Sequence, residues 1–293
     1  MADQQVAPGL VVVDKPGGLT SHGVVARVRR AVGTRKVGHA GTLDPMATGV
    51  LVLGIGRATR LLGHLMLTEK SYDATLRLGV TTVTDDAEGD VLATAATGHI
   101  TEDAVRGALA AYVGELDQVP TAVSAVKVDG RRAYERVRAG EDVELKARRV
   151  TVHDLVVHDV VLGDDGVDAR ISMRCSSGTY VRAIARDAGA DLGVGGHLTA
   201  LRRTAVGAFG LDSAVSLEEL EERGSEAVLP VADAARASFA SVDLDEDDAA
   251  SVRVGRRLDL ALEGTTALFA PDGEFLALYE PRDGVARAVA VFV

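Results

Sequence analysis

The chain has 293 residues, 47% of them hydrophobic and 26% charged, a composition typical of a globular protein with a sizeable core. Acidic residues outnumber basic ones by 43 to 32, and the resulting net charge of −11 argues against nucleic-acid binding if the charge is evenly spread. It is not evenly spread, because residues 211–293 hold the whole excess while residues 1–210 are neutral and residues 1–70 are net basic.

The first part of the chain alternates short strands and helices. Residues 9–13 predict an aliphatic strand that ends in a turn at 14–18. A helix follows, which Thr20 or Ser21 can cap and Gly33 stops. The next expected elements are a loop at 38–49, a buried strand at 50–55, a strand with one buried face at 72–83 and a helix at 101–113.

The second part is richer in strands. We expect a strand at 122–128, two strands at 150–161 and 167–174 joined by the hairpin turn 163–166, and a helix at 179–192. After a helical connection at 211–242, the pattern predicts an acidic helix at 245–254 and three short strands, at 266–270, 275–279 and 285–293. This irregular order favours an α+β fold over a doubly wound sheet.

Other features exclude several classes of protein. The single cysteine, Cys175, excludes an internal disulfide and a cysteine-rich zinc site. The first eight residues do not form a signal peptide, and the longest aliphatic runs are too short to cross a membrane. We therefore expect a cytoplasmic protein without membrane contact.

The most unusual segment is residues 38–49, which combine His39 and Asp44 with several glycines just before a buried strand. Catalytic residues often lie on such loops, and an Asp there can act as a nucleophile or a general base. On this segment alone, however, an ordinary Asp-Pro turn is the simpler interpretation.

The flanking sequence changes that interpretation. Five separated blocks, in the same order, resemble the bacterial tRNA pseudouridine-55 synthases, the TruB family. They lie at residues 14–21 with 36–51, 70–72, 119–135, 175–182 and 196–204. The resemblance implies a pseudouridine-synthase catalytic domain at 1–235, built on a mixed, largely antiparallel sheet flanked by helices, with an RNA-clamping insertion at about 120–150. It also implies a small β-rich PUA-like domain at 236–293.

The resemblance assigns roles to individual residues. Asp44 corresponds to the family's catalytic carboxylate, and Arg182 to the arginine that pairs with it and would keep it ionised and oriented. Tyr72 corresponds to the tyrosine that stacks on the target base, with transfer of the C5 proton as a second implied role. Read alone, Arg182 is a surface arginine on a helix and Tyr72 a strand residue that packs inward. The other expected substrate-binding residues are Tyr180 and Leu201 in the pocket, His39 as a space-filler for the flipped base, and Lys15 with a structural or phosphate-contacting role.

Basic residues at 127–149 are expected to grip the RNA backbone. The expected contacts are Lys127, Arg131, Arg132, Arg148 and Arg149. Interleaved acidic residues leave a solvated, salt-bridged segment as the alternative. From the charge distribution we expect RNA to approach the face with Asp44 and this segment. The acidic C-terminal module is expected either to stand away from the phosphates or to present only its small arginine cluster, Arg253, Arg256 and Arg257.

The implied activity is isomerisation of the uridine at position 55 in the T-arm loop of tRNA, on a flipped-out base and without cofactor or metal. The implied partner is tRNA alone, with no obligatory protein partner or guide RNA, and the implied state is a monomer. Two alternatives stay open: a non-catalytic RNA-binding or RNA-folding protein, and a guide-RNA-dependent subunit. Without the family match, a carboxylate glycosidase would be the next hypothesis, although a second placed carboxylate is missing.

Overall fold

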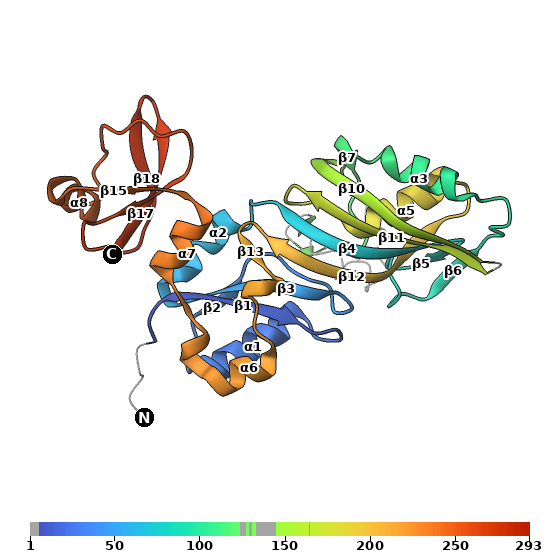
Figure 1. The fold of residues 1–293 in the computed structure, drawn as a ribbon, viewed down its shortest axis with the longest axis horizontal. Coiled ribbons are helices and arrows are strands. Elements are labelled where there is room, and N and C mark those ends of the chain that lie inside the picture. Colours follow the sequence, from blue (N-terminus) through green and yellow to red (C-terminus); the bar gives the residue numbers. More distant parts are fainter. Residues whose placement is uncertain (1–5, 124–126, 129–130, 133–144, 164) are drawn as a thin grey trace.

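The computed structural model describes residues 6–123, 127–128, 131–132, 145–163 and 165–293 (Figure 1). Within these residues, ten strands form the main sheet: β1 (Gly9–Lys15), β2 (Val37–His39), β3 (Thr48–Ile55), β4 (Lys70–Leu78), β7 (Gly114–Gln118), β10 (Arg148–Gly163), β11 (Gly166–Cys175), β12 (Gly196–Val206), β13 (Phe209–Gly210) and β14 (Leu229–Pro230). The order along the sheet is β14-β1-β3-β12-β4-β11-β10-β7, with β2 beside β3 and β13 beside β12. All pairs are antiparallel except β3 with β12.

Two apolar clusters cover opposite faces of β1, which explains its unbroken hydrophobic sequence. Val11 and Val13 belong to one cluster, whereas Leu10 and Val12 belong to the other. The first cluster includes side chains of α1 (Ser21–Val32), α3 (Glu102–Ala110), α5 (Val181–Asp191) and α6 (Leu217–Arg223). The second includes side chains of α2 (Leu62–Leu65) and α7 (Val231–Ser238). The 3₁₀ turns are η1 (Gly56–Arg60), η2 (Leu211–Ser213) and η3 (Gly224–Ala227).

The helix α1 shows why the local sequence predicts its ends. Thr20 is the N-cap, and its hydroxyl accepts a hydrogen bond from the Gly23 amide at 3.0 Å. Gly33 closes the helix in the left-handed conformation, with φ of 77°. The helix therefore starts and stops where the sequence predicts.

The junction between β3 and β12 positions the site. The two strands pair at only two positions, Arg202 with Thr48 and Arg203 with Gly49. Gly49 has φ of 97°, and a Cβ there would lie 2.1 Å from the Arg203 carbonyl oxygen, so the approach requires glycine. Farther along β12, the amide of Leu198 donates to the carbonyl of Asp85 at 3.0 Å, so the 83–90 turn lies against β12 there. That turn joins β5 (Val80–Thr82) to β6 (Val91–Thr94).

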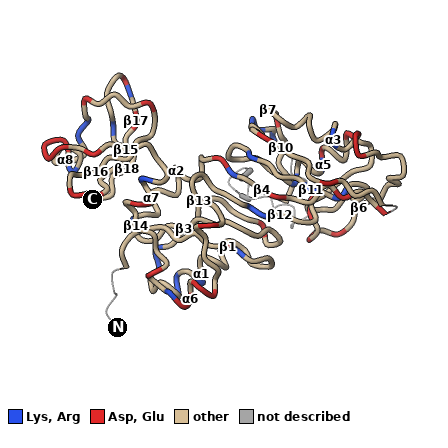
Figure 2. Tube along the Cα trace, viewed as in Figure 1, with Lys and Arg blue, Asp and Glu red and all other residues tan. Residues whose placement is uncertain are grey.

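The C-terminal module is a separate four-stranded sheet of β15 (Ala240–Asp243), β16 (Thr266–Phe269), β17 (Phe275–Arg282) and β18 (Val285–Val291), with α8 (Glu246–Arg253) beside it. Phe269 and Phe275 pack into the same cluster as α2 and α7. Arg236 of α7 stacks over the Phe269 ring at 3.7 Å. Acidic residues gather on α8 (Figure 2), in keeping with the excess charge of this region. The predicted domain boundary at 235/236 falls inside α7 and stays a prediction.

The expected α+β fold, with a mixed and largely antiparallel sheet, flanking helices and a small β module, is confirmed. The strand expected at 122–128 is wrong at its start, because residues 122–123 form a bend. Lys127–Val128 form the short β8, paired with β9 (Arg131–Arg132), and residues 124–126 lie outside the described residues. Several other strands were not expected, among them β7, β12 and β15.

Candidate active site

The loop at residues 40–47, between β2 and β3, carries Asp44, and its backbone is anchored on both sides of that residue. The buried Ser21 hydroxyl accepts from the Leu43 amide at 2.8 Å and donates to the Leu43 carbonyl at 3.0 Å. On the other side, the Pro45 carbonyl accepts from the Gly18 amide at 2.8 Å and from the Lys15 ammonium at 3.1 Å. The loop is therefore held by residues far from it in sequence, which fixes the position of the carboxylate.

Lys15 is fully buried beneath this loop. Its ammonium also donates to the carbonyls of Pro16 and Leu19, at 2.9 and 2.6 Å, so its three hydrogens all have acceptors. Burial lowers the pKa of Lys15 to about 8. Of its two expected roles, this placement favours the structural one, because a buried ammonium with three carbonyl acceptors is closed off from an RNA phosphate.

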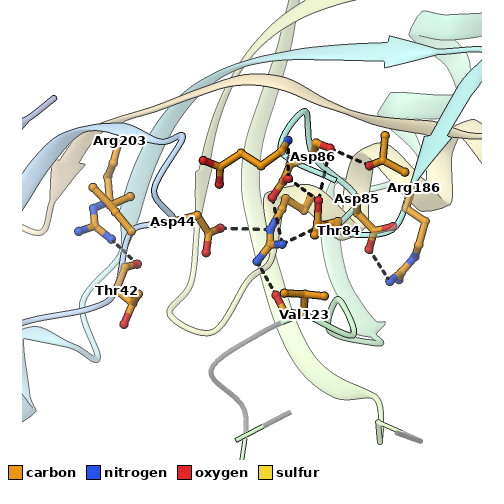
Figure 3. Close-up of polar contacts among 12 residues, drawn as sticks. Thr42, Asp44, Thr84, Asp85, Asp86, Val123, Arg186 and Arg203 are labelled. Carbon is orange, nitrogen blue, oxygen red and sulfur yellow. Dashed lines mark hydrogen bonds and ion pairs between the residues drawn. The ribbon is translucent and has the colours of Figure 1, made fainter. Parts of the chain in front are cut away.

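Arg182, at the start of α5, links two aspartates. Its Nε lies 3.1 Å from Oδ2 of Asp44, and its Nη1 lies 3.1 Å from Oδ2 of Asp86. Two carbonyls complete the set: Thr84 accepts from Nη1 at 2.8 Å and Val123 accepts from Nη2 at 3.0 Å. These groups converge from three separate segments (Figure 3), and the guanidinium is buried with a partner at each of its three nitrogens.

Asp86 is buried and is itself held in a tight turn. Its Oδ1 accepts from the Thr84 hydroxyl at 2.5 Å and from the Glu88 amide at 3.1 Å, while its carbonyl accepts from the Thr82 hydroxyl at 2.7 Å. The 83–90 turn therefore presents one oxygen of the fixed Asp86 carboxylate to Arg182.

Opposing effects act on the pKa of Asp44. Burial is the largest and raises the pKa above the ordinary value, and the nearby Asp86 raises it further. The guanidinium of Arg182 lowers it, as do Lys15 and Arg203, but together they offset burial only in part. Arg182 therefore favours the ionised form of Asp44, although the net shift of the Asp44 pKa is upward.

Asp44 opens into a cavity of about 400 Å³. The cavity is lined by Tyr72 from β4, Tyr180 and Arg182 at the start of α5, and Leu201 from β12, so these four predicted site residues meet there with Asp44 and Arg148. Gln118 fixes Tyr180, because its side-chain amide exchanges two hydrogen bonds with the Tyr180 backbone, at 2.7 and 3.0 Å. A cavity of this size suits a single nucleotide-sized ligand.

Tyr72 lies across from Arg203 in the β4–β12 register. Burial raises the pKa of the Tyr72 phenol further above its ordinary value, so the hydroxyl is protonated at neutral pH. The charge of Arg203, and a hydrogen bond with it, partly oppose that shift. Its ring packs against the first apolar cluster. Tyr72 can thus offer an aromatic face and a protonated hydroxyl at the cavity.

The remaining predicted residues lie elsewhere or outside the described side chains. His39 is on β2, opposite Leu53, with its ring edge-on to His22 at 5.5 Å, and it is not among the residues that line the cavity. Arg149 forms ion pairs with Glu115 at 2.7 Å and Asp117 at 3.3 Å. Lys127, Arg131 and Arg132 belong to β8 and β9, and their side chains lie outside the described residues.

Three residues that build the site were not predicted as site residues from the sequence: Asp86, Ser21 and Arg203. The buried Arg203 donates to the carbonyls of Val50 at 2.7 Å, Gly41 at 3.1 Å and Thr42 at 3.5 Å, and so ties β12 to the Asp44 loop. Ser21 and Arg203 both lie within blocks that resemble the family, and that was the one available signal for them. Nothing local in the acidic turn at 85–90 distinguishes Asp86 from its neighbours.

The described residues contain neither a metal-binding group nor a membrane-spanning helix. No three His, Cys, Asp or Glu side chains in the described ranges are grouped so as to hold a metal ion. Likewise, no helix in the described part of the chain is long and apolar enough to span a membrane.

Comparison with known proteins extends over nearly the whole chain. Residues 29–181 match the model of the TruB family pseudouridylate synthase N-terminal domain. Residues 182–231 match the tRNA pseudouridylate synthase B C-terminal domain, and residues 239–293 match the tRNA pseudouridine synthase II C-terminal model.

Individual relatives agree with these models. The chain is 56% identical to tRNA pseudouridine synthase B of Cutibacterium acnes, over 97% of this chain and 98% of that protein. It is 53% identical to the protein of the same name from Streptomyces griseus, over the full length of both. Among solved structures, a chain of a Cbf5–Nop10–Gar1 complex superposes with a TM-score of 0.71 at 25% identity, covering 97% of this chain and 84% of that one. The predicted family is confirmed: the chain belongs to the TruB family of pseudouridylate synthases.

Proposed function

We propose that the protein is a tRNA pseudouridine synthase that isomerises uridine 55 in the T-arm loop, with Asp44 as the catalytic carboxylate. The names of the relatives at 53–56% identity support tRNA as the substrate. The observation that carries the assignment of the site is the ion pair between Asp44 and Arg182 at the wall of a nucleotide-sized cavity.

The reaction keeps every atom of the uridine. The C1′–N1 bond breaks, the base turns, and a C1′–C5 bond forms, while C5 loses a proton and N1 gains one. Asp44 can promote this in two ways, by adding to C1′ or by promoting a glycal intermediate. Both begin from the ionised carboxylate, and the guanidinium of Arg182 stabilises that form and fixes its direction.

The target uridine lies within a folded RNA arm, so it has to leave its stack before it can reach Asp44. The cavity supplies what an extruded base requires: the aromatic face of Tyr72, the apolar side chain of Leu201 and the fixed backbone of Tyr180. In this proposal the Tyr72 hydroxyl, which burial keeps protonated, gives its proton to N1 and takes the one that C5 loses, so that the reaction gains and loses no proton overall.

Asp86 acts in this proposal as a positioning residue. It contacts neither the cavity nor Asp44 directly, but its carboxylate and the Thr84 carbonyl fix one edge of the Arg182 guanidinium. A fixed guanidinium stabilises charge without reorganising during the reaction.

The RNA approaches the face that carries Asp44 and the basic segment at 127–149. Arg148 supports this orientation, because it is exposed and lines the cavity. Arg149 is committed to two acidic partners and contributes less. We propose that the protein works on tRNA without guide RNA or partner proteins, because the named relatives at 53–56% identity are much closer than the Cbf5-containing assembly at 25%. We also propose that it does so as a monomer.

The test is to treat a tRNA transcript with the purified protein alone and to map pseudouridine by chemical modification and reverse transcription. We expect one modified position, uridine 55. Modification that appears only after adding a guide RNA or partner proteins would assign the chain to the guide-dependent class. RNA binding with no modified uridine under any of these conditions would favour the RNA-folding alternative.

A further inference from the structure

The turn between α2 and β4 exposes two large apolar side chains at the edge of the catalytic cavity. Met66 lines the cavity and is 47% exposed, and Leu67, the next residue, is 73% exposed. Within the described residues, neither side chain belongs to any of the three apolar clusters. Single exposed leucines are common, so the position of this pair beside the cavity is what calls for an explanation.

The turn is rigidly framed, so the exposure is built into the fold. The buried Lys70 ammonium donates to the carbonyl of Met66 at 2.6 Å and also to that of Thr68. The Thr68 hydroxyl donates to the Leu65 carbonyl at 2.7 Å, and the Gly207 amide donates to the Glu69 carbonyl at 2.9 Å. These bonds tie the turn to α2 on one side and to the end of β12 on the other.

The surroundings combine this apolar pair with cationic groups. Arg148 lines the same cavity. Arg174 is half-exposed and pairs with Glu69, within the turn, at 2.6 Å. Because Glu69 already neutralises Arg174, Arg148 is the guanidinium here that can contact a phosphate. An apolar face beside such a guanidinium matches a nucleotide, whose base has an apolar face and whose phosphate is anionic.

We infer that Met66 and Leu67 form an apolar contact for the nucleobase next to the target uridine. This inference rests on the proposed function, because it needs an RNA whose uridine enters the cavity. When that uridine leaves the stack, its neighbour loses a stacking partner, and apolar side chains commonly occupy such a gap. The neighbouring base is joined to the target by a single phosphodiester link, and Met66 borders the cavity that the target enters.

The test compares two leucine variants with similar exposure. Leu67→Ser removes the contact, and Leu92→Ser, at a residue 66% exposed on β6, serves as the matched control. We expect Leu67→Ser to raise the KM for a T-arm stem-loop about fivefold, with kcat at saturating RNA unchanged within about twofold. Because the contact is apolar, the ratio of the two KM values should not vary with salt. Leu92→Ser should behave as the unmodified protein does.

A second arm identifies the contacted base. Stem-loops that each lack one nucleobase beside the target uridine are tested in turn with both proteins. On the stem-loop that lacks the contacted base, the unsubstituted protein and Leu67→Ser should have the same KM, because the contact between Leu67 and that base is absent in both cases. The inference would be overturned if Leu67→Ser had an unchanged KM, or if its KM were raised equally on every stem-loop. It would also be overturned if the substitution changed the oligomeric mass of the protein and left the KM unchanged. If the unmodified protein formed no pseudouridine, the proposed function would fail first.

Discussion

Arg182 holds Asp44 through one pair of atoms, Nε and Oδ2, at 3.1 Å. Among the described residues, the second carboxylate oxygen of Asp44 has no hydrogen bond or ion pair, and the side chain is 34% exposed at the cavity. The other nitrogens of the guanidinium are taken by Asp86, Thr84 and Val123. The arginine is therefore fixed by the scaffold, while the carboxylate keeps one oxygen for the substrate.

Asp86→Asn should lower kcat about 100-fold and leave RNA affinity nearly unchanged, because a misdirected guanidinium no longer aligns Asp44. The measurement is single-turnover release of tritium from C5-labelled uridine in tRNA, together with a filter-binding Kd. Asp85→Asn is the matched control, since Asp85 pairs with Arg186, at 3.5 Å, and makes no hydrogen bond or ion pair with Arg182 among the described contacts. Equal rates for the two variants would remove Asp86 from the positioning of Arg182.

The acid side of the pH profile should reflect the raised pKa of Asp44. The proposed reaction needs the carboxylate, so kcat/KM should rise with pH through a midpoint above the ordinary Asp value of about 4. In Arg182→Lys the charge is withdrawn from Asp44, which should move that midpoint upward by about one pH unit. Arg186→Lys, with its charge paired to Asp85 and Asp187, should leave the midpoint in place. A downward shift in Arg182→Lys would contradict this electrostatic account.

Arg203 should matter for stability more than its neighbour. Its buried guanidinium satisfies three carbonyls, so Arg203→Met should lower the free energy of unfolding by about 3 kcal/mol in urea titrations. Arg202 instead forms a partly exposed ion pair with Asp14 at 2.6 Å, and Arg202→Met should cost less than about 1 kcal/mol. Similar losses for both would show that the link between β12 and the Asp44 loop adds no particular stability.

Arg148 and Arg149 are adjacent but should differ in RNA binding. Arg148→Ala should weaken binding and reduce the slope of log Kd against log salt by about 1, as expected when one phosphate contact is lost. Arg149→Ala should have a smaller effect, because Glu115 and Asp117 already neutralise its charge. A larger effect of Arg149→Ala would mean that RNA displaces those acidic partners.

Local sequence signals predicted many helices and turns, because the residues that start or end these elements lie within or next to them in the chain. The caps of α1 and the turn between β10 and β11 are examples. The strand β12 was missed because its sequence does not alternate cleanly and its pairing with β4 contains two irregularities. Residues 196–206 form a strand because they pair with β4 and β3 in the sheet.

The site could be predicted from family resemblance but not from local physical signals. Asp44 and Arg182 are 138 positions apart in the chain, and no local pattern brings them together. Asp86 is a further example, because it reaches Arg182 through a turn that, in the sequence alone, is merely acidic. Burial of an arginine such as Arg203 likewise depends on carbonyls supplied by distant residues.

The most direct test is single-turnover modification of tRNA by Asp44→Asn with enzyme in excess. Burial raises the pKa of Asp44, so ionising it costs folding free energy, a cost that grows as pH rises from the ordinary Asp pKa to the raised one and is complete above it. The variant should therefore be no less stable than the unsubstituted protein at neutral pH. We predict unchanged tRNA affinity and no detectable pseudouridine at position 55. Pseudouridine formation by Asp44→Asn at a rate near that of the unmodified protein would contradict the central claim that this carboxylate performs the reaction.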